Sequence, residues 1–69
     1  MTIQQLLDAL RSEVCRRMAN GEFTERSLAG RVGVSQPQIH NVLKGARKLT
    51  PELADRVLEA LGISVLDLF

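Results

Sequence analysis

The stretch of residues 25–44 constrains the fold of this chain more than any other part of it. On each side of Gly33, apolar residues recur three and four positions apart, which is the spacing of one face of a helix. Gly33 can adopt a positive φ without a Cβ clash, as a residue just past a helix end commonly does. Ser35 then follows as a potential N-cap. The pattern therefore predicts two short helices, 25–32 and 36–44, joined by a tight turn.

The second of these helices has an outward face that is polar and rich in amides. We expect it to contact DNA base edges through Gln36, Pro37, Gln38, His40 and Asn41. Amide side chains can bond an adenine edge at two positions, and the N-terminal end of a recognition helix is the part that enters the major groove. Pro37 has no donor, so it could only touch a thymine methyl group or set the height of the helix in the groove. An exposed polar face without a ligand is the alternative interpretation, and for His40 it is the stronger one.

At these residues the chain resembles the lambda repressor and Cro-like (XRE-type) helix-turn-helix family, over residues 24–69. The matching positions are Thr24 to Ala29, Gly33 to Gln36, Ile39, Gly45, Leu61 to Ser64 and Leu68. The resemblance implies an all-α, five-helix lambda repressor-like DNA-binding domain, with a loop at residues 46–48 that contacts the DNA backbone. It also implies a phosphate-binding glutamine directly after the helix cap, but Glu25 occupies that position. Phosphates would repel a carboxylate there, unless it serves the helix dipole or an intramolecular partner.

The rest of the chain supplies helices on both sides of the motif. Thr2 with Gln5 three positions later is a capping-box pattern, and a long apolar stripe follows it. Thr50 and Pro51 give another helix start, with a cap and a proline in the first turn. We expect a single domain over residues 1–69, with no strand and with helices at about 3–19, 25–32, 36–44, 51–61 and 65–68.

The positive charge of the chain is concentrated at the motif. The net charge is only +1, but residues 22–48 hold five basic residues against two acidic ones, whereas residues 49–69 hold one against four. Such a cluster suits the phosphates of nucleic acid. We expect phosphate contacts from Thr24, Arg26, Ser35, Lys44, Arg47 and Lys48. Arg11, Arg16 and Arg17 could also contact phosphates, although a solvated helix face is the simpler interpretation for them.

Composition argues against several other classes of protein. The chain has one cysteine, Cys15, and one histidine, so one chain can form neither an internal disulfide nor a four-ligand zinc site. No apolar run approaches the roughly eighteen residues of a membrane span, and the N-terminus lacks the pattern of a signal peptide. We therefore expect a cytoplasmic protein with no metal and no cofactor. We expect no enzyme activity either. A nucleophile would need a positioned base, and Cys15 and His40 lie on different predicted helices.

The apolar C-terminal tail predicts a contact with another protein chain. Leu66, Leu68 and Phe69 exceed what so short a helix can bury, although Leu68 could instead cap the core. Members of the family that the chain resembles commonly pair through this end, so we expect a two-fold dimer contact from Leu66 and Phe69. We expect a homodimeric transcriptional repressor that binds double-stranded DNA. The alternative is an antitoxin-like interaction module of the same fold, which would neutralise a partner toxin.

Overall fold

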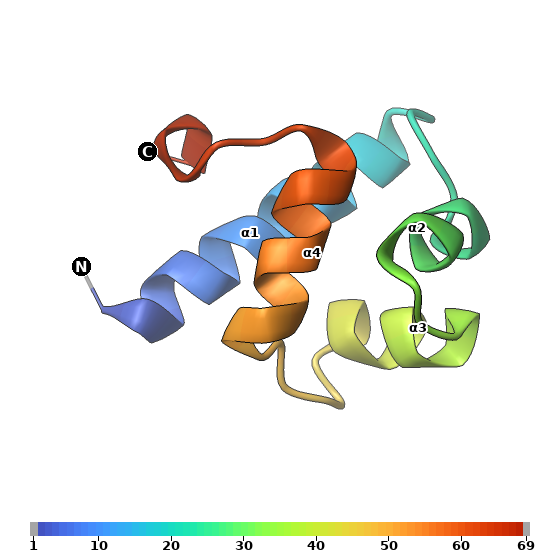
Figure 1. Cartoon of the computed structure of the whole chain (residues 1–69), viewed down its shortest axis with the longest axis horizontal. Helices are drawn as coiled ribbons and strands as arrows, with labels where there is room; N and C mark the ends of the chain where they lie inside the picture. The colour runs from blue at the N-terminus through green and yellow to red at the C-terminus, as the bar shows by residue number, and fades with distance from the viewer. Residues whose placement is uncertain (1, 69) are drawn as a thin grey trace.

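The computed structural model describes residues 2–68, without the side chain of Val65. It contains α1 (Ile3–Ala19), α2 (Glu25–Val32), α3 (Gln36–Lys44) and α4 (Pro51–Leu61), followed by a short 3₁₀ helix, η1 (Val65–Leu68). No strand occurs among the described residues. Figure 1 shows α2 and α3 together on the side of the molecule away from both chain ends, with α4 crossing α1 beside them. The predicted all-α class is thus confirmed.

The prediction of five helices was wrong for the last element, which is a single 3₁₀ turn. The backbone N–H of Asp67 donates to the carbonyl of Ser64, which is the i→i+3 bond of that geometry. The Asp67 carboxylate in turn accepts the N–H of Ser64 at 2.9 Å. Four residues cannot complete the i→i+4 bonds of an α-helix and also satisfy their ends, so the segment stays in the tighter turn.

Each α-helix begins at a hydroxyl residue that accepts an N–H from the first turn. These caps are Thr2, Thr24, Ser35 and Thr50. At the other end of α2, Gly33 has a φ of 87°, and its N–H donates to the carbonyl of Ala29 at 2.8 Å. The N–H of Val34 also bonds the Ala29 carbonyl, at 3.1 Å. These bonds stop α2 and reverse the chain within three residues, so that α3 begins against α2.

The core joins all four helices. Its most completely buried large side chains are Leu10 and Val14 of α1, Leu28 of α2 and Ile39 of α3. Burying each of them stabilises the fold by roughly 1.5–3 kcal/mol. Ala29 is 3% exposed, and its small side chain lets α2 and α3, the two helices joined by the turn, approach closely. The core thus fixes α3 by one face and leaves the opposite face in solvent.

Candidate nucleic-acid interface

The solvent face of α3 carries the residues that the sequence predicts as base contacts. Gln36, Pro37, His40 and Asn41 are exposed, whereas Gln38 is half-buried. The helix is held from behind by Ile39, which is 1% exposed, and by other core residues of the same face. Ser35 caps the helix by accepting the N–H of Gln38 at 3.3 Å. Its hydroxyl hydrogen remains available to an acceptor outside the helix.

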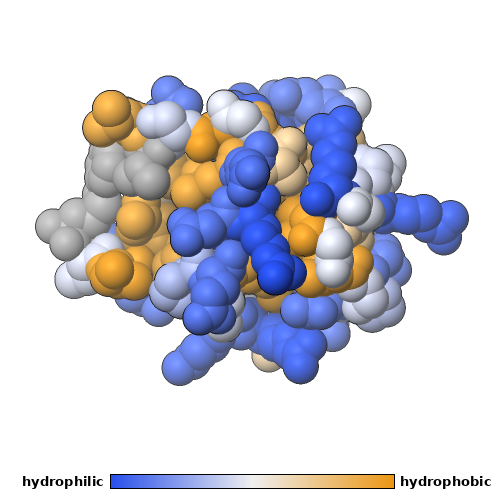
Figure 2. Space-filling model, viewed as in Figure 1, coloured by the Kyte–Doolittle hydropathy of each residue, from blue (hydrophilic) through white to orange (hydrophobic). Residues whose placement is uncertain are grey.

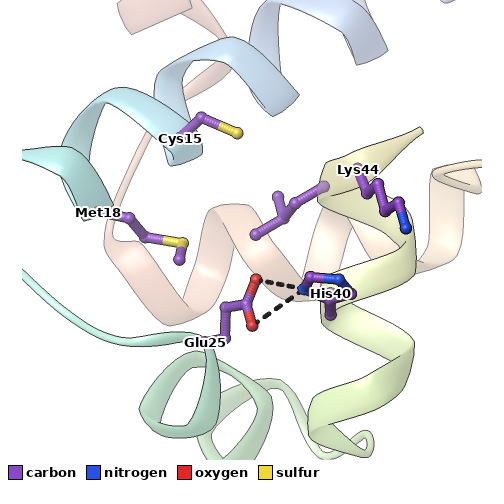
Figure 3. A pocket seen from close by; sticks show the side chains of 6 residues that line it. Cys15, Met18, Glu25, His40 and Lys44 are labelled. Atoms are coloured by element: carbon purple, nitrogen blue, oxygen red, sulfur yellow. Dashed lines mark hydrogen bonds and ion pairs between the residues drawn. The ribbon is translucent and has the colours of Figure 1, made fainter. Parts of the chain in front are cut away.

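Two of the predicted base contacts are tied to α2 through Glu25. The Nε2 of Gln36 donates to Oε1 of Glu25 at 2.8 Å. The Nδ1 of His40 lies 3.0 Å from Oε2 and 3.3 Å from Oε1 of the same carboxylate. Figure 3 shows the Glu25 carboxylate pointing at the His40 ring, with Lys44 one turn further along α3. One acid at the start of α2 therefore bridges two side chains on consecutive turns of α3.

This bridge stabilises the ionised form of Glu25. The hydrogen bond from His40, and after it the one from Gln36, holds the pKa of the Glu25 carboxyl below its usual range. An ionised carboxylate can only accept hydrogen bonds, so the His40 atom facing it carries a hydrogen. The structure thus gives Glu25 an intramolecular partner. In the family that the chain resembles, this position is expected to hold a phosphate-binding glutamine.

Two open depressions are lined in part by Glu25. One, of about 320 Å³, is lined by Cys15 and Met18 of α1 and by Glu25, His40, Leu43 and Lys44. The other, of about 470 Å³, is lined by Met18, Phe23, Thr24, Glu25, Arg26 and Gln36. The second depression brings two predicted phosphate contacts, Thr24 and Arg26, beside the predicted base contact Gln36.

Thr24 is engaged in its own helix start. Its Oγ1 accepts the N–H of Ser27 at 3.1 Å, and its backbone N–H donates to Oγ of Ser27 at 3.4 Å. The Thr24 hydroxyl keeps a hydrogen that it can donate outward. A phosphate at this helix start would therefore meet a hydroxyl donor and the positive end of the α2 dipole.

The predicted basic contacts are exposed, and within residues 2–68 none of them pairs with an acid. These residues are Arg26, Lys44, Arg47 and Lys48. The loop that carries two of them is attached to α3, because the N–H of Arg47 donates to the carbonyl of Asn41 at 3.1 Å. Cations without intramolecular partners, held beside an amide-bearing helix face, are suited to binding an anionic ligand.

The arginines of α1 behave differently. Arg11 lies 3.5 Å from Asp8, and Arg17 lies 3.7 Å from Glu13. Arg16 also bonds Glu13, and this contact lowers the pKa of that acid and raises the pKa of the arginine. The α1 arginines therefore pair with acids of their own helix, and Arg11 and Arg17 are half-buried rather than fully solvated.

The C-terminal turn presents one of the two residues predicted as dimer contacts. Leu66 is 80% exposed, whereas Leu68 packs against the core. Phe69, the other predicted contact, lies outside the described residues. An apolar groove between α1 and α4 opens next to this turn, with Ile3, Leu58 and Leu68 among its lining residues. On the face that Figure 2 shows, hydrophobic residues gather on the side of the two chain ends, and others are visible between the polar side chains further along.

Comparison with known families decides the class of protein. A family model described as helix-turn-helix matches residues 16–68, which cover α2, α3 and α4 together with the end of α1. The chain belongs to this lambda repressor-like helix-turn-helix family. No curated protein and no solved structure matches the chain.

Membership in the helix-turn-helix family makes the chain a DNA-binding regulatory protein, of a class that is typically not enzymatic. No group of three or more His, Cys, Asp or Glu side chains in the described part of the chain could hold a metal ion. The helices between residues 2 and 68 include none that is long and apolar enough to cross a membrane.

The sequence did not reveal the specific link from Glu25 to α3. One signal was available, because Gln36 and His40 are four residues apart and so share a face of the helix. The missing information was which α2 residue this face would meet.

Proposed function

We propose that this helix-turn-helix protein binds duplex DNA sequence-specifically as a homodimeric transcriptional repressor. The observation that carries the proposal is the exposed, amide-bearing face of α3, bordered by basic residues that pair with no acid among residues 2–68. Such a face supplies donors and acceptors for base edges, and its border supplies cations for phosphates.

The contacts divide by chemistry. Gln36 and Asn41 would bond base edges in the major groove, and Pro37 would touch a thymine methyl group. Gln38 would contribute its exposed part at the helix tip, and the free edge of His40 would lie near a base or a phosphate. The phosphate contacts would come from Thr24, Arg26, Ser35, Lys44, Arg47 and Lys48. Each good bidentate base contact discriminates against the wrong base by roughly 1–3 kcal/mol.

A two-fold dimer would place two copies of α3 on one face of the DNA. Leu66 and Phe69 would form the contact between the subunits, and the exposure of Leu66 supports this assignment. The half-sites would then lie about 34 Å apart, which is one turn of the duplex. A dimer bound in this way within a promoter would repress transcription by occupying the site.

Selection of bound sequences from a pool of random duplexes tests the proposal. The expected result is a partly palindromic motif whose two halves are centred about one helical turn apart. A single short motif without symmetry would contradict the dimer but not the sequence-specific binding. If no motif is enriched even at low salt, sequence-specific recognition is wrong.

A second candidate function is binding of a partner protein, as an antitoxin neutralises a toxin. The exposed Leu66 and the apolar groove between α1 and α4 favour it, because apolar surface of this kind is common at protein interfaces. Purification from the source cell after nuclease treatment separates the two functions. A stoichiometric partner that remains without DNA, and that Leu66→Asp releases, would support this second function.

A further inference from the structure

We infer that Glu25 is a positioning residue for base recognition, and that it holds Gln36 and His40 in one orientation as a coupled pair. This inference rests on the proposed function, because it concerns how the same α3 face would discriminate between sequences. Glu25 itself need not touch the DNA. Its effect would pass through the two α3 side chains that it bonds.

The Glu25 carboxylate determines which way the amide of Gln36 points. An amide has a donor end and an acceptor end of nearly equal size, so a free glutamine can present either end. At 2.8 Å from an ionised carboxylate, only the NH₂ end of Gln36 is favourable, since its oxygen would be repelled. The carbonyl oxygen and the second N–H of Gln36 then remain for DNA. An acceptor beside a donor is the pair that an adenine edge requires.

The same carboxylate determines the tautomer of His40. Both Glu25 oxygens lie within 3.3 Å of Nδ1, so the hydrogen of a neutral ring resides on Nδ1. The ring is half exposed, and its free nitrogen, Nε2, is then an acceptor. Without Glu25 the ring could turn and exchange tautomers. Glu25 thus fixes the hydrogen-bonding character of two neighbouring groups on the proposed contact face.

The charge of Glu25 argues that its role is not simply to favour DNA binding. A carboxylate near the proposed phosphate contacts Thr24 and Arg26 repels the DNA backbone. Removing the charge of Glu25 should therefore weaken the positioning of Gln36 and His40 but strengthen the affinity of the chain for DNA. A residue that only stabilised the fold would not separate the two properties.

Three variants test the inference by selection from random duplexes. Glu25→Ala removes the acceptor and should weaken base preference by about three- to tenfold at the position contacted by Gln36 and at any base contacted by His40, because each side chain must then be ordered on binding. Glu25→Gln keeps an acceptor but loses the charge, so it should bind all duplexes more tightly while discriminating less than the natural chain. Glu52→Ala is the matched control, since Glu52 is also an acid in a first helical turn but is exposed and lies on α4. It should leave the motif unchanged.

A measurement without DNA tests the geometry separately. In the nitrogen NMR spectrum of the natural chain, the chemical shifts of the His40 ring nitrogens should be those of the Nδ1–H tautomer. The chemical shifts of the Gln36 side-chain amide protons should differ from those of a solvent-exposed glutamine. Both signals should move to solvent-exposed values in Glu25→Ala and stay in place in Glu52→Ala. If Glu25→Ala leaves both unchanged, Glu25 does not hold the pair and the inference is wrong.

The selection results distinguish this inference from the proposed function. If the natural chain enriches a motif that Glu25→Ala recognises with unaltered preferences, the positioning role is overturned while sequence-specific binding stands. If the natural chain enriches no motif, the proposed function fails and the positioning role fails with it. Glu25→Gln remains informative if Glu25→Ala does not fold.

Discussion

The Nδ1 of His40 lies 3.0 Å from the carboxylate of Glu25, which stands fifteen residues earlier in the chain. The pair crosses the turn between α2 and α3, so it reports directly on how the two helices of the motif are placed. Gln36 adds a second bond to the same acid. The helix that would enter the major groove is therefore attached to its neighbour by polar contacts as well as by the core.

This bridge should contribute stability in a way that depends on pH. The pKa of Glu25 is lowered in the folded chain, first by the hydrogen bond from His40 and then by that from Gln36. Stability from such a group is fully present above the pKa of the unfolded carboxyl and is lost as the pH falls through the lower folded value. Thermal unfolding of the natural chain and of Glu25→Gln between about pH 7 and about pH 3 measures the effect.

The natural chain should unfold at a higher temperature than Glu25→Gln at neutral pH, and the difference should shrink as the pH falls. Glu13, whose pKa is also lowered, is present in both proteins and drops out of the comparison. A difference that stays constant down to the lowest pH would contradict a role for the ionised Glu25 carboxylate.

The turn makes a second prediction through two glycines of the same segment. Gly33 has a φ of 87°, and a Cβ added there meets no atom within 4 Å, so only backbone strain opposes a side chain. Gly33→Ala should destabilise the fold by roughly 1–2 kcal/mol, the cost of a left-handed conformation for a residue with a Cβ. Urea unfolding measures this change in the free energy of unfolding.

Gly30 provides the matched control for Gly33. It lies within α2, is exposed, and has equally open surroundings for a Cβ. Gly30→Ala should stabilise the fold by roughly 0.5–1 kcal/mol, because alanine loses less conformational freedom in a helix. Equal effects at the two positions would contradict the assignment of the turn to backbone conformation.

Local features of this fold could be predicted from the sequence, whereas relations between helices could not. The caps at Thr24 and Ser35 and the left-handed Gly33 follow from chemistry within a few residues. The C-terminal segment was counted as a fifth helix but is a 3₁₀ turn, because four residues are too few for periodicity to separate an α-turn from a 3₁₀ turn. The single-domain organisation stays a prediction.

The candidate site divides in the same way. Periodicity was enough to place Pro37 and Asn41 on the exposed face of α3. The bonds from Glu25 to Gln36 and His40 depend on the crossing of two helices, which periodicity does not define. The contacts of all these residues with DNA stay predictions.

Base contacts and phosphate contacts should respond differently to mutation. Asn41→Ala should relax preference at one base pair, with a loss of roughly 1–3 kcal/mol of discrimination there. Lys48→Ala should weaken binding to all duplexes alike and reduce the slope of log K against log salt by about 0.9, the value for one phosphate contact. Binding isotherms at several salt concentrations, on the selected site and on an unrelated duplex, measure both quantities. If the two variants lose the same proportions of affinity and specificity, the assigned roles are wrong.

Leu66 offers a test of the proposed dimer that leaves the fold intact. Its side chain is 80% exposed, so Leu66→Asp should change the free energy of unfolding of the isolated chain by no more than about 0.5 kcal/mol. In a dimer contact the same substitution would place a charge in an apolar interface and should shift the chain to monomer. Sedimentation at increasing protein concentration measures the association.

The variant should also bind a single half-site nearly as well as the natural chain, while losing the advantage of two half-sites on one duplex. A natural chain that remains monomeric on its selected site would contradict the dimer. It would not contradict the proposed α3 contacts, which a single chain can make.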